Sequence, residues 1–145
     1  MSRPVVVLVA ATALVAVVVC AGVGMAAGAT TWDVYTGEGT PIQDAIDDAD
    51  PGDTIHVHAG TYVENVDADK ERLTLIGDGA DVVTVRAVDA GDHVFEVTEG
   101  WVNVSGFTVD GVNGSWLAAG IYLGSGVDHC NISDNNASNN NCAYT

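Results

Sequence analysis

Two histidines separated by one residue form the clearest chemical pattern in the chain. His56 and His58 alternate with aliphatic residues, so in a β-strand both imidazoles lie on one face of the strand. Two imidazoles on one face suit Cu²⁺, Ni²⁺ or Zn²⁺, and His93 or His129 would add a third ligand if the fold brought it near. We predict a metal site at His56 and His58, with a pair of solvated strand histidines as the alternative interpretation.

Acidic turns offer a second kind of ligand. The turn Gly77-Asp78-Gly79 and the segment from Asp89 to Asp92 place carboxylates where oxygen ligands could hold Ca²⁺. No repeated calcium-binding nonapeptide accompanies them, so no residue is assigned to calcium. Copper and calcium stay as the two cofactor alternatives, and no cofactor is certain.

The charge of the chain excludes one class of partner. Its 145 residues include 20 Asp and Glu against 4 Lys and Arg, for a formal net charge of -16. A nucleic-acid backbone would meet mostly like charge, so we exclude nucleic acid as a partner. This charge also opposes a compact state unless salt screens it, which predicts either a solvated acidic surface or a halophilic protein.

An uncharged apolar run at the N-terminus predicts export. Arg3 precedes this run, and no charged residue occurs from Val5 to Ala29, where the small residues Ala27-Gly28-Ala29 form an A-x-A site. We predict a signal peptide over residues 1–29, a mature chain that starts at Thr30, and a secreted, extracellular or cell-surface location. A retained signal anchor is the alternative and the only membrane contact that we expect.

An exported chain can carry disulfides and glycans. Cys130 and Cys142 are a candidate disulfide, with two small buried residues in turns as the alternative. Four N-x-S sequons are candidate glycosylation sites, at Asn103, Asn113, Asn131 and Asn136.

One helix and many short strands must position these residues. After a lead-in over residues 30–39, a helix is predicted over residues 40–50, with Thr40 as N-cap, Pro41 at the first helical position and Gln43 completing a capping box. Short strands and turns rich in Gly, Asp and Asn fill residues 53–145. These strands recur at offsets of 27 to 29 residues, which predicts a β-solenoid, with a β-sandwich as the rival fold.

The ends of such a solenoid expose unpaired backbone groups and must be covered. The helix over residues 40–50 stands before the first coil, where it would act as a cap. The sequence stops directly after an Asn-rich turn. We therefore expect coils that are truncated at the C-terminus, as in a fragment of a longer surface protein, or a partner chain that covers the last coil.

Three stretches carry a resemblance to a known fold: P-I-Q-D-A-I-D-D-A-D-P-G-D-T-I-H-V-H-A-G-T-Y-V-E-N-V, L-T-L-I-G-D-G-A-D-V-V-T-V and G-I-Y-L-G-S-G-V-D-H-C-N-I-S-D-N-N-A-S-N-N. They resemble right-handed parallel β-helix proteins of the pectin-lyase-like superfamily, in particular the NosD-type periplasmic copper-binding family and archaeal cell-surface repeat proteins. The resemblance covers about residues 40 to 141 and implies an all-β, right-handed parallel β-helix with an N-terminal capping helix. The matched residues serve packing and turning, so they say little about activity.

The first of these stretches is also similar to the start of pectin methylesterases. That family works with paired carboxylates in later coils, whereas the comparable coils here have no Gln-Asp pair, and Arg72 and Arg86 are the only arginines after residue 29. Related lyases need Ca²⁺ and a basic residue at the substrate. The chain holds no complete catalytic constellation, so we predict a non-enzyme and interpret Asp110 as a turn residue.

Aromatic side chains suggest a binding role, because Trp101, Trp116, Tyr122 and Tyr62 could stack on sugars, with core packing as the alternative. The first functional hypothesis is a secreted or cell-surface β-helix repeat protein, either a non-enzymatic scaffold or a carbohydrate-associated binding module. Its partners would be cell-surface polysaccharide or further β-helix coils. The alternative is NosD-type metal (copper) handling. A third is the N-terminal fragment of a polysaccharide-modifying enzyme, of pectin esterase or lyase type.

Overall fold

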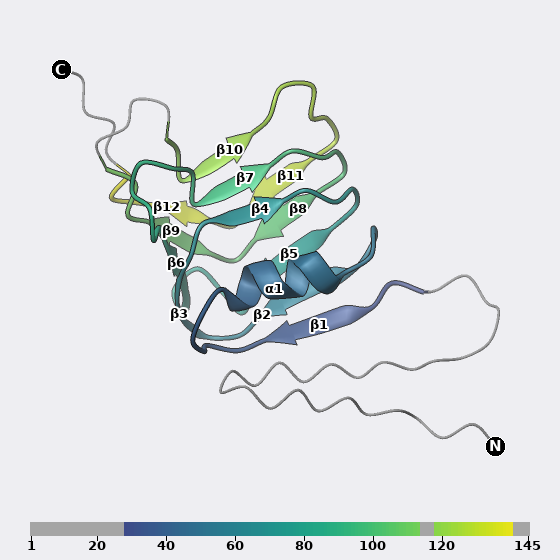
Figure 1. The fold of residues 1–145 in the computed structure, drawn as a ribbon, viewed down its shortest axis with the longest axis horizontal. Helices are drawn as coiled ribbons and strands as arrows, with labels where there is room; N and C mark the ends of the chain where they lie inside the picture. The colour runs from purple at the N-terminus through teal and green to yellow at the C-terminus, as the bar shows by residue number, and fades with distance from the viewer. Residues whose placement is uncertain (1–27, 114–117, 141–145) are drawn as a thin grey trace.

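The computed structural model describes residues 28–113 and 118–140 and shows a parallel β-solenoid with one short helix (Figure 1). Most of the predicted signal peptide, residues 1–27, lies outside these ranges. No helix within them is long and apolar enough to cross a membrane. The elements are β1 (Thr31–Val34), α1 (Pro41–Asp48), β2 (Thr54–Val57), β3 (Gly60–Val63), β4 (Val66–Ala68), β5 (Thr74–Gly77), β6 (Val83–Arg86), β7 (Phe95–Val97), β8 (Asn103–Ser105), β9 (Thr108–Asp110), β10 (Ile121–Leu123), β11 (Asn131–Ser133) and β12 (Asn136–Ala137).

The strands form three parallel sheets, in the orders β1-β2-β5-β8-β11, β10-β7-β4 and β12-β9-β6-β3. The chain visits each sheet once per coil, so β2, β3 and β4 make one coil and β5, β6 and β7 make the next. Leu75 pairs with Val104, and Val104 pairs with Ile132, which is the repeat that the sequence predicts. The β-solenoid prediction is confirmed, and the β-sandwich is excluded because its sheets would be antiparallel.

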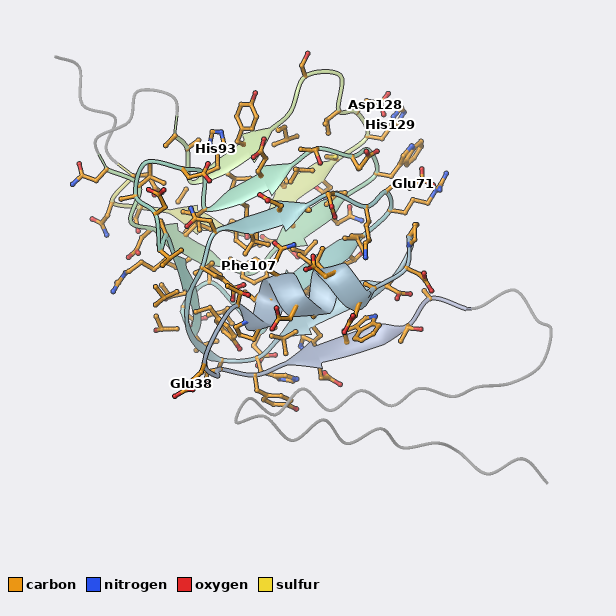
Figure 2. The ribbon with its side chains drawn as sticks, viewed as in Figure 1. Glu38, Glu71, His93, Phe107, Asp128 and His129 are labelled. Carbon is orange, nitrogen blue, oxygen red and sulfur yellow. The ribbon has the colours of Figure 1, made fainter. Side chains whose placement is uncertain are left out.

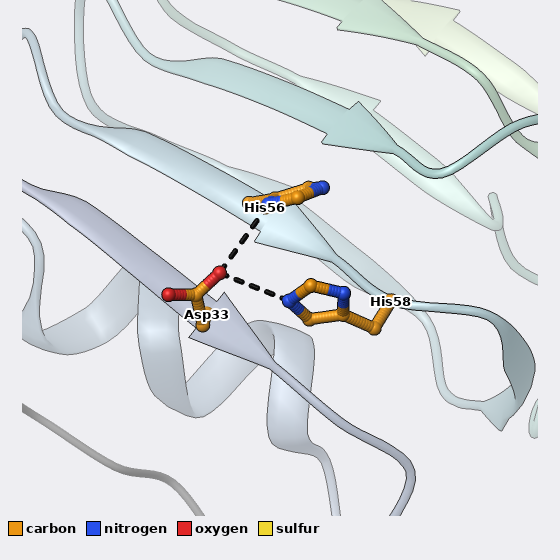
Figure 3. A group of neighbouring side chains, drawn as sticks. All are labelled: Asp33, His56 and His58. Carbon is orange, nitrogen blue, oxygen red and sulfur yellow. Dashed lines mark hydrogen bonds and ion pairs between the residues drawn. The ribbon is translucent and has the colours of Figure 1, made fainter.

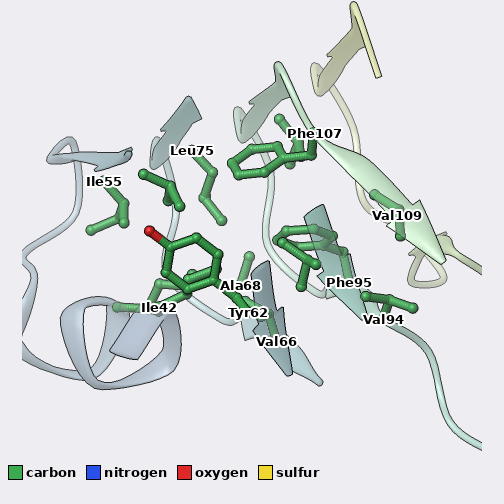
Figure 4. Packing of buried hydrophobic residues seen from close by; sticks show 14 of the residues in the cluster. Ile42, Ile55, Tyr62, Val66, Ala68, Leu75, Val94, Phe95, Phe107 and Val109 are labelled. Atoms are coloured by element: carbon green, nitrogen blue, oxygen red, sulfur yellow. The ribbon is translucent and has the colours of Figure 1, made fainter. Parts of the chain in front are cut away.

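The interior is a column of side chains contributed by every second strand residue. Ile55, Leu75 and Val104 are fully buried and stack in one ladder along the first sheet (Figure 4). Phe95 and Phe107 meet in the centre with ring centroids 5.2 Å apart and planes tilted by 51°. Burial of each such side chain contributes about 1.5 to 3 kcal/mol. The core therefore fixes which residues of each strand point outward.

Helix α1 packs its apolar side against the first coil. Ile42, Ala45 and Ile46 are buried, and the helix contacts β1, β2 and β4 (Figure 1). The spacing of these residues puts them on one face, as the sequence predicts. The acidic residues of the helix lie on its exposed side.

The predicted capping box at the start of α1 is wrong. Thr40 is the N-cap residue, but its side chain makes no capping hydrogen bond, and the side chain of Gln43 donates to Asp47 instead. The N–H groups of Ile42 and Gln43 donate to the buried carboxylate of Glu64, at 3.2 and 3.0 Å. A residue of the following coil therefore does the work that the sequence pattern assigns to the helix itself.

The other end of α1 is held by Lys70. Its Nζ donates to the carbonyl oxygens of Ile46, Asp47 and Ala49 at 2.7, 2.6 and 2.7 Å. A cation is favourable at this end because the last carbonyls of a helix carry partial negative charge. Glu64 and Lys70 flank β4, so one coil grips the helix at both ends.

Candidate metal centre

Strands β1 and β2 bring three side chains to one point on the outer face of the first sheet. His56 lies on β2 in register with Asp33 of β1, and His58 follows β2 directly. Because Ile55 and Val57 are buried in the core, the alternation of the strand turns His56 outward. Figure 3 shows both imidazoles directed toward the carboxylate of Asp33.

The distances within this group suit a single small ion. Asp33 Oδ1 lies 3.3 Å from His56 Nδ1 and 2.9 Å from His58 Nε2. One ligand atom from each residue lies within 4.8 Å of the other two. Among residues 28–113 and 118–140, these residues form the one such group of three histidine, cysteine or acidic side chains.

A second carboxylate holds the far side of both imidazoles. Asp78 Oδ1 lies 2.9 Å from His56 Nε2, and Asp78 Oδ2 lies 3.3 Å from His58 Nδ1. The backbone N–H of Ala59 donates to Asp78 Oδ2 at 3.0 Å. This bond, followed by the contacts with His56 and His58, lowers the pKa of Asp78 below its ordinary value, so the carboxylate is an acceptor.

The four nitrogen–oxygen contacts fix where protons can lie. A neutral imidazole carries one N–H, so two neutral rings supply two protons for four contacts with acceptors. If those protons face Asp78, His56 Nδ1 and His58 Nε2 direct lone pairs at Asp33. The space between them then needs two more protons or one divalent cation. A carboxylate that accepts from the non-ligating nitrogens of metal-bound histidines is the usual arrangement around such an ion.

The group is partly open to water. The side chains of His56, His58 and Asp33 are 33%, 24% and 47% exposed. The ring of Tyr35 stacks on His58, with centroids 4.3 Å apart and planes 9° from parallel, and covers one side of that imidazole. Three protein ligands at an exposed position leave further coordination positions for water.

The other predicted third ligands do not join this group. His93 Nδ1 accepts a hydrogen bond from the N–H of Ala119 at 3.0 Å, and its ring stacks on Tyr122. His129 stacks on Trp101 and contacts Asp128 at 3.0 Å. Figure 2 shows His93 and His129 on separate parts of the upper coils.

The acidic turns considered for calcium are occupied by local hydrogen bonds. Asp89 Oδ1 accepts from the N–H of Gly91 at 2.8 Å, and Asp92 Oδ1 accepts from the N–H of His93 at 2.8 Å. Asp78 belongs to the histidine group. These carboxylates shape turns, and the described residues bring no third oxygen ligand to either turn.

The remaining candidate residues lie on later coils. Cys130 is half-buried, and Cys142 lies outside the described residues, so the disulfide stays a prediction. The four sequon asparagines lie in the described part of the chain, half-buried at Asn103 and exposed at Asn113, Asn131 and Asn136.

The aromatic candidates divide into core and surface. Tyr62 is buried and donates to the carbonyl oxygens of Val34 and His58, so it fills the core. Trp101 is 50% exposed and Tyr122 is 38% exposed, but each has one ring face covered by a histidine. Trp116 lies outside the described residues.

Asp110 is not a simple turn residue. It is buried at the end of β9, and its carboxylate accepts from Arg86 Nε at 2.8 Å and from Arg86 NH2 at 3.2 Å. This two-bond pair with Asp110 raises the pKa of the Arg86 guanidinium. The pair links β6 to β9.

Two members of the site were missed as ligands by the sequence analysis. Asp33 was placed in the lead-in, because its offset of 23 residues from His56 is shorter than the repeat of 27 to 29. Asp78 was considered only for calcium. The alternation in Thr31–Val34 is the signal that could have identified β1 and, with it, Asp33.

Comparisons with known proteins support the fold. No family model and no curated protein matches the chain. Among solved structures, the chain is similar to a pectin methylesterase crystallised with a hexasaccharide, with a TM-score of 0.57 and 14% sequence identity. The match covers 77% of this chain and 43% of that chain, so this chain spans less than half of that structure. With the three parallel sheets, this similarity supports a right-handed parallel β-helix and shows the fold alone.

Proposed function

We propose that this protein is a β-helix scaffold that binds one divalent transition-metal ion through Asp33, His56 and His58. The observation that supports this proposal is the set of four nitrogen–oxygen contacts between two imidazoles and two carboxylates. A divalent ion beside Asp33 supplies the positive charge that these contacts require and lets Asp78 hold both rings. Metal handling, the alternative in the sequence analysis, thereby becomes the leading function.

Copper is the ion that this donor set favours. Two imidazole nitrogens and one carboxylate oxygen bind borderline metals, and affinity for such sites rises along the divalent series to Cu²⁺ and falls at Zn²⁺. Ca²⁺ prefers six to eight oxygen ligands, so the two nitrogens disfavour it. The ligand set agrees with the NosD-type metal handling implied by the sequence resemblance.

The proposal includes a place for the protein. Residues 1–29 direct export, and the protein acts outside the cell, secreted or at the cell surface. Helix α1 caps the first coil, because its buried residues Ile42 and Ile46 face that coil. Later coils or cell-surface polysaccharide would extend or contact the scaffold.

Carbohydrate association is the second candidate function. The fold similarity to a pectin methylesterase and the exposed ring of Trp101 support it. The net charge of -16 disfavours anionic polysaccharides and favours neutral ones. Quenching of tryptophan fluorescence by neutral oligosaccharides, lost in Trp101→Ala, would support this candidate.

Calorimetric titration of the purified full chain with Cu²⁺ and Zn²⁺ tests the metal proposal. We expect one ion per chain, with Cu²⁺ bound more tightly than Zn²⁺. The double variant His56→Ala/His58→Ala and the single variant Asp33→Asn should lose this binding. His129→Ala, which removes an exposed histidine elsewhere, is the matched control and should keep it. Equal binding by the double variant and the control would contradict the proposal.

A further inference from the structure

Asp53 is a buried carboxylate whose hydrogen-bond partners are all N–H groups. It is 4% exposed, and its Oδ2 accepts from Trp32 Nε1 at 2.9 Å and from the N–H of Asp50 at 3.0 Å. Its Oδ1 accepts from the backbone nitrogen of Thr30 at 2.7 Å. In the described part of the chain, Asp53 makes no ion pair within contact distance.

This carboxylate is ionised at neutral pH. Burial raises the pKa of Asp53, but the hydrogen bonds from Trp32, Thr30 and Asp50 and the charge of Lys70 outweigh it, so the net pKa lies below the ordinary value. The ammonium of Lys70 is itself engaged with the carbonyl groups at the end of α1. A buried negative charge without a contacting cation is costly, and a positive charge at the Thr30 nitrogen would offset that cost.

The same nitrogen lies at the cleavage point that the sequence predicts. Ala27-Gly28-Ala29 ends directly before Thr30. Gly28, Ala29 and Thr30 are exposed, and a side chain built on Gly28 would meet no atom within 4 Å. The peptide bond between Ala29 and Thr30 is therefore accessible from the solvent.

We propose that hydrolysis of the Ala29–Thr30 peptide bond creates an α-ammonium at Thr30 that forms an ion pair with Asp53 and anchors β1. An export-associated endopeptidase adds one water across this amide, which leaves a carboxylate on Ala29 and an ammonium on Thr30. Atoms and charge balance without any oxidant or reductant. Processing would then complete the first rung of the β-helix.

The position of Thr30 makes the pairing specific. Its carbonyl oxygen accepts from the N–H of Thr54 at 2.8 Å, so the residue is fixed on both sides. One additional residue would move the terminal nitrogen by about 3.5 Å, outside contact with Asp53. The ion pair therefore requires cleavage at this one bond and does not depend on a bound metal.

The test begins with the full chain expressed in an exporting host. Mass spectrometry of the secreted protein should give Thr30 as the first residue. The α-amine of this protein, followed by NMR, should titrate above the usual range of about 7.7 to 8.0, because Asp53 stabilises its charged form. A different first residue, no cleavage, or a titration in the usual range would overturn the proposal.

A variant with one glycine inserted after Ala29 and cleaved before that glycine moves the ammonium away from Asp53. Its folding equilibrium constant should fall about fivefold relative to the protein that starts at Thr30. With Asp53→Asn in both backgrounds, the insertion should have no effect. An equal loss with and without Asp53 would contradict the pairing. If Asp53→Asn does not fold, the titration of the α-amine decides alone.

Discussion

Asp78 holds both imidazoles of the metal centre from the side opposite Asp33. It contacts one nitrogen of His56 at 2.9 Å and one of His58 at 3.3 Å, and the N–H of Ala59 orients it. It thereby selects the ring nitrogens that remain free for a metal. Asp78 is a positioning residue, because the metal ligands of the proposed site lie on the other side of the rings.

Asp78→Asn tests this positioning role. The amide can accept only through one oxygen, so at least one ring loses its fixed orientation. We expect the affinity for Cu²⁺ to fall by about 10- to 100-fold with stoichiometry unchanged, measured by calorimetric titration. Asp128→Asn, which changes a carboxylate beside His129, is the control. Unchanged affinity in Asp78→Asn would show that the rings need no such support.

Glu64 gives the residue scale a pH-dependent feature. Burial, opposed by the N–H groups of Gln43 and Ile42, raises the pKa of Glu64 from 4.5 to about 7. A raised folded-state pKa means that the stabilisation is complete below pH 4.5 and is lost as the pH rises through about 7. The charged form is the less stable one in the folded protein.

Glu64→Gln should therefore flatten the dependence of stability on pH. Between pH 4.5 and 8, the free energy of unfolding of the unmodified protein should fall relative to that of the variant by at most about 3 kcal/mol. Denaturant unfolding at several pH values measures this difference. Glu38→Gln, an exposed position near the start of the helix, is the control and should follow the unmodified protein. Parallel curves for Glu64→Gln would contradict the assignment.

At the scale of elements, close contact between coils depends on glycine. Gly106 has φ of 82°, and a side chain on it would lie 2.5 Å from the carbonyl oxygen of Gly77 in the preceding coil. Neither backbone can move without disturbing the ladder of hydrogen bonds between β5 and β8. Gly126 has nearly the same φ, 85°, but no atom lies within 4 Å of such a side chain.

The two glycines make a matched pair of variants. Gly126→Ala should cost about 1 to 2 kcal/mol, the strain of a left-handed backbone. Gly106→Ala should cost about 2 kcal/mol more, because the coils must also separate. Thermal and denaturant unfolding compare the two. Equal losses would show that the distance between these coils is not limiting.

The elements also explain which features the sequence could predict. The solenoid and its repeat follow from local patterns, since Val104 and Ile132 occupy equivalent places in strands of similar sequence. The site depends on pairing between β1 and β2, whose spacing differs from the repeat because α1 replaces two strands there. Asp33 could not be placed without that register. The role of Glu64 at the helix start was hidden for the same reason, because it depends on contact between elements.

At the scale of the whole molecule, negative charge dominates. The net charge is -16, and Asp67 illustrates its effect, because burial and then the charges of Asp92, Asp69 and Asp47 raise its pKa. Only salt or bound cations can screen such repulsion over the surface. The same charge attracts metal cations toward the outer face of the first coil.

Stability should consequently rise with salt. We expect Tm to increase by about 5 °C or more between 0.1 and 2 M KCl, because the Debye length falls from about 10 Å to below 3 Å. Circular dichroism during heating measures this change. Asp47→Asn/Asp92→Asn, which removes two neighbours of Asp67, should reduce the increase. Full stability in dilute buffer with no gain from KCl would contradict a salt-dependent fold.

The metal centre is the central claim, and anomalous X-ray diffraction from crystals grown with Cu²⁺ tests it most directly. We predict one anomalous peak per chain, bonded to His56 Nδ1, His58 Nε2 and a carboxylate oxygen of Asp33 at about 2.0 to 2.2 Å. Asp78 should remain hydrogen-bonded to the opposite nitrogens. A peak at His93 or His129, or no peak at the outer face of β1 and β2, would contradict the account.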